Sequence, residues 1–439
     1  MKVLKFGGTS VGSPQRMKEV AKLINDGDKK IVVLSAMSGT TNSLVEISDY
    51  LYKKNPEGAN EVINKLESKY KQHINELYST EEYKQKTWSL IKDIFNGIRS
   101  FTKEIFTLFE EKVILAQGEL MSTNMVTNYL LEQGVNVVLL PALDFMRTDK
   151  NAEPDSVYIK SKLAAQLEMH PDAELYITQG YICRNAYGEV DNLQRGGSDY
   201  SASLIGAAVN ASEIQIWTDI DGIHNNDPRI VDKTSPVRQL HFEEAAELAY
   251  FGAKILHPTC IQPAKFANIP VRLLNTMEPT APGTLISNDT ELGKIKAVAA
   301  KDNITAIQIK SGRMLLAYGF LRKVFEIFES YQTSIDMICT SEVGVSVSID
   351  DTKHLNEIVN DLKKYGIVTV DHDMCIICVV GDLRWENVGF EAKALDAMSE
   401  IPVRMISFGG SDYNISFLVS KEDKKRSLQS LSDHLFNNN

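Results

Sequence analysis

A cation, two glycines and a helix start lie together near the N-terminus. The segment 2–6 is apolar enough for a short strand and carries Lys5. Gly7 and Gly8 follow it, and they remove side chains where the backbone must turn or approach a ligand closely. Pro14 is well placed for the first turn of a helix, whose free amide groups and partial positive charge suit a phosphate. We therefore predict a phosphate site here. An ordinary strand-to-helix turn is the alternative, because the spacing is neither a P-loop nor a dinucleotide fingerprint.

A second pair of glycines lies between Arg195 and Ser198, before a helix of small residues. Gly196 and Gly197 again place bare backbone at a helix N-terminus, where an anion is favoured. The guanidinium of Arg195 can hold a carboxylate with two parallel hydrogen bonds. Asp199 cannot bind an anion itself, but it can orient lysines or a metal ion. Two such loops in one chain favour an anionic substrate over two simple capped turns.

Further polar residues follow other predicted strands. Thr41 belongs to a small, hydroxyl-rich loop at 37–42, after the apolar strand 31–36. Gln117–Ser122 is expected to open a helix, with Glu119 near its N-terminal end, where a carboxylate is electrostatically favoured. Glu119 could grip a substrate ammonium group, and the alternative is an ordinary first-turn acid.

The long turn at 218–229 is rich in Asp, Gly and Asn. Its acidic groups could bind Mg²⁺ through water or hold ribose hydroxyls, and Arg229 could reach a phosphate. Lys254, beside a glycine, is a second candidate phosphate lysine. His224 alone is more typical of a surface or packing histidine than of a catalytic one.

The elements that must position these residues alternate between strand and helix. Apolar strands are expected at 31–36, 135–140, 175–182 and 214–217, and helical patterns at 44–116 form a scaffold. Open α/β sheets bind ligands at the carboxyl ends of their strands. The polar loops after these strands are therefore expected to share one edge of a sheet.

Composition limits the class of protein. The 439 residues suggest two or three domains, and 43% apolar with 24% charged residues is ordinary for a globular chain. The net charge of −11 argues against a general nucleic-acid or anionic-membrane binder. Without an apolar leader or a bilayer-length apolar run, we expect a cytoplasmic protein.

Five cysteines, an odd and small number, are typical of reduced structural thiols. Cys375 and Cys378 have a metal-ligand spacing, but they lie in a β-branched run that predicts a strand. Residues three apart on a strand point to opposite faces, so we expect no metal site there.

The pattern changes from about residue 292, where a repeat of about 70 residues begins. Helices are expected to start after Gly319 and Gly389, and strands to follow at 343–349 and 413–419. A β-α-β-β-α-β order suits a ferredoxin-like sandwich. Small modules of this kind commonly pair side by side, so a homodimer is expected.

Together these stretches resemble the aspartate kinases, within the amino acid kinase fold, and the tail resembles their tandem ACT regulatory domains. The match spans nearly the whole chain and rests on Lys5–Ser10, Ser35–Asn42, Gly118–Ser122, Arg147-Thr148, Arg195–Asp199, Trp217–Asp219, Asp227–Arg229 and Phe251–Lys254. The resemblance implies a three-layer αβα fold with a mostly parallel sheet at 1–291. Two interleaved ferredoxin-like ACT domains would follow at 292–439, one inserted at about 306–375 and the other formed by about 292–305 and 376–439.

The resemblance also implies a reaction, in which ATP and L-aspartate give ADP and 4-phospho-L-aspartate, the first step toward lysine, threonine and methionine. The substrate's ionised carboxylate is the nucleophile, so positioning and charge neutralisation suffice. ATP would arrive with Mg²⁺, and no tightly held protein metal is implied. The implied catalytic residues are Lys5, Gly7, Gly8, Asp199 and Lys254. The implied substrate-binding residues are Thr41, Glu119, Arg195 and Ser198. The implied ATP-binding residues are Lys5, Ser10, Thr218, Asp219, His224, Arg229 and Lys254.

The tail resembles the lysine-sensitive, monofunctional type, which makes feedback by lysine or another amino acid a hypothesis. The implied effector residues are Tyr318, Phe320, Leu321, Ser334, Ile335, Asp336, Thr340, Ser341, Glu342 and Val343. Two departures are His224, where many relatives have tyrosine, and Leu316–Tyr318, which replaces more polar residues. The alternatives are a kinase for glutamate or N-acetylglutamate, a catalytically silent amino-acid sensor, and a fusion with a dehydrogenase, for which the chain leaves no room after Asn439. A homodimer or a dimer of dimers is expected.

Overall fold

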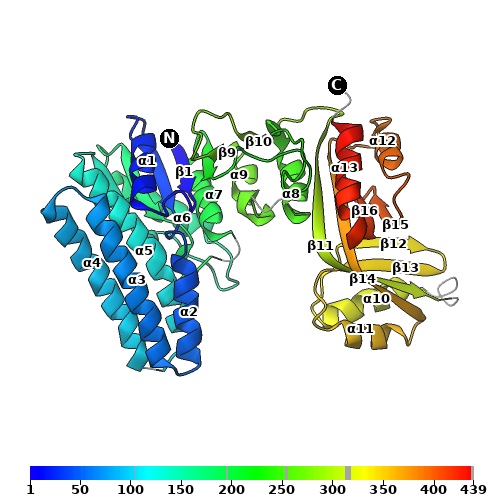
Figure 1. Ribbon diagram of the computed structural model, residues 1–439, viewed down its shortest axis with the longest axis horizontal. Coiled ribbons are helices and arrows are strands. Elements are labelled where there is room, and N and C mark those ends of the chain that lie inside the picture. The colour runs from blue at the N-terminus through cyan, green and yellow to red at the C-terminus, as the bar shows by residue number, and fades with distance from the viewer. Residues whose placement is uncertain (104, 194–195, 253–255, 312–317, 437–439) are drawn as a thin grey trace. The chain divides into compact units, whose positions relative to one another are not determined.

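The computed structural model describes residues 1–439 except 104, 194–195, 253–255, 312–317 and 437–439 (Figure 1). The chain forms two compact units. The first unit contains Met1–Ile223 and Leu256–Asn288, and the second unit contains His224–Ile255 and Asp289–Asn439. Among the helices described, none has the length and apolar character needed to cross a membrane.

A mostly parallel sheet forms the centre of the first unit, in the order β3-β4-β2-β1-β7-β9-β10. Parallel pairing aligns the carboxyl ends of β1, β2 and β7, because Phe6 is in register with Leu34 and Trp217. β10 pairs antiparallel with β9. The strands are β1 (Lys2–Phe6), β2 (Lys30–Leu34), β3 (Val137–Leu140), β4 (Leu175–Gln179), β7 (Ile214–Thr218), β9 (Val271–Asn275) and β10 (Thr284–Ser287), with β5 (Ile182–Arg184) and β6 (Val190–Asn192) forming a separate hairpin.

Helices cover this sheet, and the predicted scaffold helices are confirmed. Long helices α2 to α5 lie side by side (Figure 1), and their apolar faces form one core around Tyr70 and Phe95. The helices are α1 (Pro14–Ile24), α2 (Thr40–Tyr52), α3 (Pro56–Leu77), α4 (Glu81–Ser100), α5 (Leu108–Glu132), α6 (Ser156–Glu168), α7 (Gly197–Val209) and α9 (Gln262–Phe266), with short 3-10 turns at Phe101–Lys103, Ala142–Asp144 and Pro258–Ile261.

Two local predictions are wrong. Helix α5 does not open at Gln117, so Glu119 lies in its middle rather than near its N-terminal end. The helix begins at Leu108 because Thr107 and Glu110 form a capping box. Gly118 continues the helix and lets it approach the loop after β2, since an added Cβ would lie 2.7 Å from the Cβ of Ala36.

The strand expected at 175–182 is also wrong in its last residues. β4 ends at Gln179, and Tyr181 has a φ of 69°. That left-handed conformation ends an extended run, so Ile182 starts β5 of the hairpin instead of continuing β4.

One antiparallel sheet organises the second unit, in the order β12-β13-β11-β14-β16-β15. Two long central strands, β11 (Ile295–Lys310) and β14 (Ile367–Gly381), pair along their length, with register shifts near Asn303. The other elements are β8 (Gln239–His241), α8 (Phe242–Tyr250), α10 (Phe320–Ser330), β12 (Met337–Ser341), β13 (Gly344–Ile349), α11 (Leu355–Leu362), α12 (Phe390–Ala397), β15 (Val403–Phe408), β16 (Asn414–Ser420), a 3-10 turn (Lys421–Asp423) and α13 (Lys424–Leu435).

The predicted repeat is confirmed as two modules, each with its own core. The second half of β11, β12, β13 and the first half of β14 pack with α10 and α11 around Phe320 and Phe328. The first half of β11, the second half of β14, β15 and β16 pack with α12 and α13 around Phe390 and Phe417. The modules are thus interleaved in the sheet, while the domain boundaries expected above stay a prediction.

Cys375 and Cys378 lie in β14, where the sequence predicts a strand, and both are buried. Burial raises the pKa of Cys375 to about 12. Both cysteines are therefore protonated packing residues of the sheet at neutral pH.

Candidate active site

An ion pair stands at the carboxyl end of the first strand. The Nζ atom of Lys5 in β1 lies 2.7 Å from Oδ1 of Asp199, and the two side chains are 11% and 16% exposed. Asp199 is in the first turn of α7, where the helix dipole favours its negative charge. The two predicted glycine loops therefore meet through these side chains, although the loops are more than 180 residues apart in the sequence.

The glycines after β1 bring backbone close to this pair. The amide of Gly7 donates to the carbonyl of Trp217 over 3.3 Å, and a Cβ at Gly7 would lie 3.6 Å from the Nζ atom of Lys5. Gly8 meets the loop after β2, because its carbonyl accepts from the amide of Ser38. A Cβ on Gly8 would lie 2.8 Å from the carbonyl oxygen of Ala36. Gly8 is therefore required by close packing of two loops at the strand ends.

The second glycine loop is fixed by contacts of the same kind. Gly196 caps α7 with a φ of 75°, and its carbonyl accepts from the amide of Asp199. Ser198 lies against Gly180, just after the end of β4. A Cβ added at Gly180 would lie only 2.5 Å from the Cβ of Ser198. Gly180 is a residue that sequence reasoning missed, since its role depends on a tertiary contact. Arg195 lies outside the described residues.

Glu119 lies within α5 and faces the loop after β2. Its Oε1 atom accepts from the amide of Ala36 over 3.1 Å, and its Oε2 atom is buried with no hydrogen-bond partner in the described part of the chain. The residue is 4% exposed, and burial raises the pKa of its carboxyl to about 7. A buried carboxylate oxygen without a donor favours binding of a cationic group.

The remaining predicted residues of the first unit occupy different surroundings. Thr41 is exposed in the first turn of α2, whereas its neighbour Thr40 is buried against Tyr70. Ser10 bonds through its hydroxyl to Thr276, whose amide in turn donates to the carbonyl of Thr218. Ser10 and Thr218 therefore lie on either side of one threonine at the strand ends. Asp219 is exposed just after β7.

Two predicted nucleotide residues belong to the second unit. The Nδ1 atom of His224 lies 2.9 Å from Oγ1 of Thr234. The side chain of Arg229 makes two hydrogen bonds to Asp227 and its backbone amide makes a third, and these bonds lower the pKa of that carboxyl. Arg229 also lines a pocket of about 320 Å³ with Lys421 and Lys424. Lys254 lies outside the described residues.

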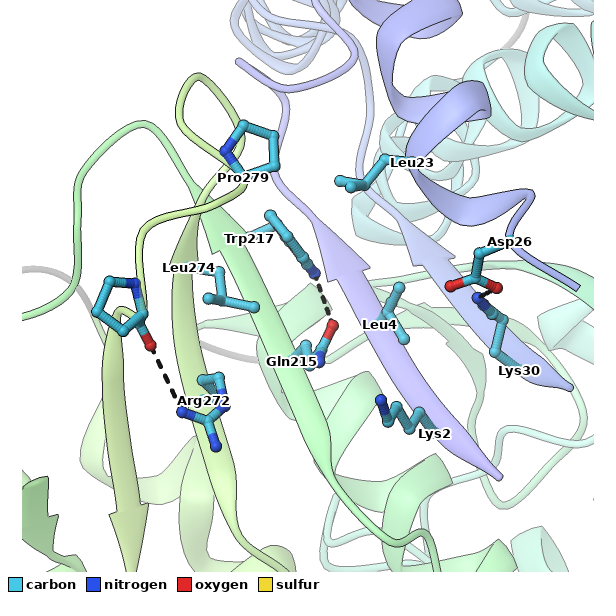
Figure 2. Close-up of a pocket in the computed structure, with 11 residues that line it drawn as sticks. Lys2, Leu4, Leu23, Asp26, Lys30, Gln215, Trp217, Arg272, Leu274 and Pro279 are labelled. Atoms are coloured by element: carbon cyan, nitrogen blue, oxygen red, sulfur yellow. Dashed lines mark hydrogen bonds and ion pairs between the residues drawn. The ribbon is translucent and has the colours of Figure 1, made fainter. Parts of the chain in front are cut away.

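A pocket of about 400 Å³ in the first unit lies on the other face of the sheet (Figure 2). Its wall includes Leu4 and Trp217, with Arg272 bonded to the carbonyl of Pro282. Side chains alternate between the faces of a strand, so Leu4 and Lys5 point to opposite sides. The Lys5–Asp199 pair therefore does not line this pocket.

The candidate effector residues gather around α10 and the β12–β13 hairpin. Phe320 is a core residue of its module, and Ile335 packs against the same core. Asp336 has a side chain that is only 1% exposed and pairs with Lys301. Those with exposed side chains are Tyr318, Leu321, Ser334, Thr340, Ser341, Glu342 and Val343.

Comparison with known proteins gives two family matches. Residues 1–275 match the amino acid kinase family, and residues 377–435 match the ACT domain. Aspartokinase 1, chloroplastic, of Arabidopsis thaliana is 34% identical over 99% of this chain and 80% of its own length. The chain belongs to the amino acid kinase family, among the aspartokinases.

Solved structures of aspartokinases have the same fold. The E. coli aspartokinase III structure in complex with lysine and aspartate, a T-state, has a TM-score of 0.82 and 33% identity, and 99% of each chain is covered. The E. coli aspartokinase III structure with aspartate and ADP, an R-state, also has a TM-score of 0.82, with 32% identity over 99% of this chain and 100% of that one. The expected fold class, an amino acid kinase domain followed by ACT domains, is confirmed for this aspartokinase.

Proposed function

We propose that this chain is an aspartate kinase that transfers the γ-phosphoryl group of ATP to the side-chain carboxylate of L-aspartate. The observation that carries the proposal is the buried Lys5–Asp199 pair between two glycine loops at the carboxyl ends of parallel strands. Such an edge combines the full positive charge of Lys5 with the partial positive charge at the N-terminus of α7. That combination suits a transferring phosphoryl group.

The residues supply positioning and charge. The nucleophile is a carboxylate that is ionised at neutral pH, so no side chain has to remove a proton. The ammonium of Lys5 and the amide of Gly8 would neutralise charge that develops on the phosphoryl oxygens. The amide of Gly7 donates to the carbonyl of Trp217, so Gly7 would hold the loop close to them. Asp199 is a positioning residue, because its carboxylate fixes where the ammonium of Lys5 stands.

Recognition of the amino acid uses opposite charges. Glu119 offers a buried oxygen to the substrate ammonium, and Arg195 would hold the α-carboxylate. Ser198 and Thr41 would add hydrogen bonds. A free α-amino group is thereby preferred over an N-acetylated one, which carries no ammonium charge.

The nucleotide would arrive as its Mg²⁺ complex. Ser10, Thr218 and Asp219 lie at the strand ends of the first unit and would contact it there. His224, Arg229 and Lys254 are further proposed nucleotide residues.

Regulation by an amino acid at the ACT modules completes the proposal. The E. coli aspartokinase III structure was solved with lysine, so L-lysine is the first effector to test. A homodimer is expected, and light scattering that gives a monomer mass at micromolar concentration would contradict it. The cytoplasmic location stays a prediction.

A trapping assay tests the reaction. The protein is incubated with Mg-ATP, hydroxylamine and either L-aspartate or L-glutamate, and the acyl hydroxamate is measured. We expect hydroxamate with aspartate alone, and its loss in Lys5→Ala but not in Lys22→Ala, an exposed lysine of α1. Hydroxamate from glutamate alone would reassign the substrate. Hydroxamate from neither would reject the kinase reaction in favour of a silent amino-acid sensor.

A further inference from the structure

Helix α3 contacts the loop that follows β2, although the sequence predicts only a scaffold role for this helix. The hydroxyl of Tyr70 lies 2.9 Å from Oγ1 of Thr40, the first residue of α2. One residue earlier in α3, the Nζ atom of Lys69 donates to the carbonyl of Ser38 over 3.1 Å. Two consecutive residues of one helix therefore hold this loop at two points.

The start of α2 has no side-chain cap of its own. Its N-cap is Gly39, which has a φ of 82° and no side chain that could accept from the free amides of the first turn. Thr40 and Tyr70 are both fully buried. Because a buried hydroxyl needs a hydrogen-bond partner, the bond between these two side chains satisfies both of them and fixes the start of α2.

The same loop contacts the proposed ammonium ligand. The amide of Ala36 donates to Oε1 of Glu119. Gly118 precedes Glu119 in α5 and faces the loop. A Cβ at Gly118 would lie 2.7 Å from the Cβ of Ala36 and 3.4 Å from Cγ2 of Thr40. Helix α5 therefore packs on Thr40 at the turn that carries Glu119, and Thr41, a proposed substrate residue, comes next to Thr40 in the chain.

Tyr70 is also close enough to Glu119 to be affected by its charge. Burial raises the pKa of the Tyr70 hydroxyl, the bond to Thr40 opposes this, and the carboxylate of Glu119 raises the pKa further. The hydroxyl is therefore protonated at neutral pH and keeps a donor for its bond to Thr40.

We infer that Tyr70 is a positioning residue for the amino-acid substrate and that it acts through Thr40. Its hydroxyl fixes Thr40 between α3 and α5, and this packing sets the separation of Thr41 and Glu119, the two proposed aspartate ligands on either side. Tyr70 is fully buried, so it acts through the loop. The inference rests on the proposed function, because it assumes that aspartate binds between Thr41 and Glu119.

Tyr70→Phe isolates the hydroxyl, because it keeps the ring that packs edge-on against Phe95. In the hydroxamate assay we expect the KM for aspartate to rise roughly 3- to 10-fold, as for the loss of one hydrogen bond. The kcat and the KM for ATP should change less than two-fold.

The partner hydroxyl provides an independent variant. Thr40→Val removes this hydroxyl and keeps the shape of the side chain, so it should raise the KM for aspartate as Tyr70→Phe does. Thr40→Ser restores the hydroxyl and should recover most of the affinity that Thr40→Val loses. The double variant Tyr70→Phe/Thr40→Val should be no worse than either single variant, because both remove the same bond.

Tyr78→Phe is the matched control. Tyr78 is buried in the same core, and its hydroxyl donates to the carbonyl of Met125 in α5 over 2.7 Å. The control therefore removes a buried tyrosine hydrogen bond that does not involve the loop after β2. We expect Tyr70→Phe and Tyr78→Phe to lower Tm by similar amounts, and only Tyr70→Phe to change the KM for aspartate.

An unchanged KM for aspartate in Tyr70→Phe and Thr40→Val would overturn the inference. So would an equal rise in Tyr78→Phe, which would reflect a general loss of stability, or a double variant whose effect is the product of the two single effects. If Tyr70→Phe does not fold, Thr40→Val and Thr40→Ser provide the same test. A wild-type protein that forms no aspartyl hydroxamate would reject the proposed reaction together with the inference, whereas an unchanged KM beside normal hydroxamate formation would reject the inference alone.

Discussion

Two lysine–aspartate pairs of similar length have opposite surroundings. In the first unit, Lys5 lies 2.7 Å from Asp199 and has that one carboxylate as its ion-pair partner among the described residues. In the second unit, Lys301 lies 2.6 Å from Asp336 and also contacts Asp350 and a tyrosine ring. Burial alone would lower the pKa of Lys301, but its bonds to Asp336 and Asp350 outweigh burial and raise it.

The difference indicates that Lys5 can still bind a ligand, whereas the contacts of Lys301 are already made within the chain. An ammonium group has three donors. Lys5 forms an ion pair with Asp199 and lies close to the glycine backbone at Gly7, so its ammonium has donors left for phosphoryl oxygens. Lys301 is surrounded by acceptors of its own chain, so its charge stabilises the fold. The length of a salt bridge therefore says little about its role, whereas the number of partners says much.

The largest expected effect is the loss of kcat in a Lys5 variant, compared with the same substitution at Lys301. Lys5→Met should lower kcat roughly 100- to 1000-fold, because charge on the phosphoryl group loses a preorganised partner. It should lower stability less than Lys301→Met does, because the Asp199 side chain is 16% exposed and that of Asp336 only 1%. Lys301→Met should keep kcat within a few-fold but lower stability by about 3–5 kcal/mol, because Asp336 becomes a buried charge without its cation. Steady-state kinetics and thermal unfolding of both variants measure this. Equal losses of kcat in both would remove the distinction.

The partner of Lys5 gives the next largest effect. Asp199→Asn keeps the shape of the side chain but loses the charge that fixes the ammonium, so kcat should fall roughly 10- to 100-fold through misplacement. Asp191→Asn is the control, because Asp191 forms a 2.7 Å pair with Lys112 in the same unit and its side chain is equally buried. A similar fall in the control would mean that any lost ion pair impairs the enzyme.

The close approach of the Gly8 backbone to Ala36 at the first site can be tested without changing any charge. Gly8→Ala should reduce kcat/KM by roughly ten-fold, because its Cβ would meet the carbonyl oxygen of Ala36 at 2.8 Å and shift the loop. Gly97→Ala in α4 has open space around the new Cβ and should be neutral or slightly stabilising. Full activity in Gly8→Ala would show that the loop tolerates the methyl group.

The last expected effect depends on pH. The pKa of Glu119 is raised to about 7 in the folded chain and is near its usual value of about 4.3 when unfolded. A raised pKa contributes stability that is present below the unfolded value and is lost as pH rises through about 7. Glu119→Gln should therefore raise Tm of the protein without aspartate at pH 8 and change it little at pH 4.5. The gain in the free energy of unfolding at pH 8 should be at most about 4 kcal/mol.

The same group predicts a kinetic trend. Below pH 7 the Glu119 carboxyl is increasingly neutral, so the wild-type KM for aspartate should rise as pH falls, while Glu119→Gln should have a high KM that depends little on pH. A wild-type KM that is independent of pH from 6 to 8 would argue against Glu119 as the ammonium ligand.

Local signals predicted the elements around the first site. The apolar run of β1 and the proline at the start of α1 are read from neighbouring residues, and the structure has both. The start of α5 also has a local signal, the Thr107–Glu110 capping box, but the sequence analysis places the helix start at Gln117 instead. A glycine inside a helix can serve close packing, as Gly118 does against Ala36.

Contacts between distant residues could not be predicted in this way. Tyr250 and Asp336 are 86 residues apart, and no periodicity or motif in either segment indicates the other. The approach of Gly180 to Ser198 is of the same kind. Sequence patterns identified side chains with suitable chemistry, whereas their partners depended on how the strands and helices pack.

The shared strands of the second unit have a consequence for protein engineering. β11 and β14 run unbroken through both modules, so one module cannot be replaced by that of another protein without cutting two strands. Asn303 and Asp373 are both left-handed, with φ of 61° and 52°, beside the register shift where the strands pass between modules. Chimaeras that exchange effector specificity should be joined at these two residues, since a crossover elsewhere would leave a half-strand without its partner.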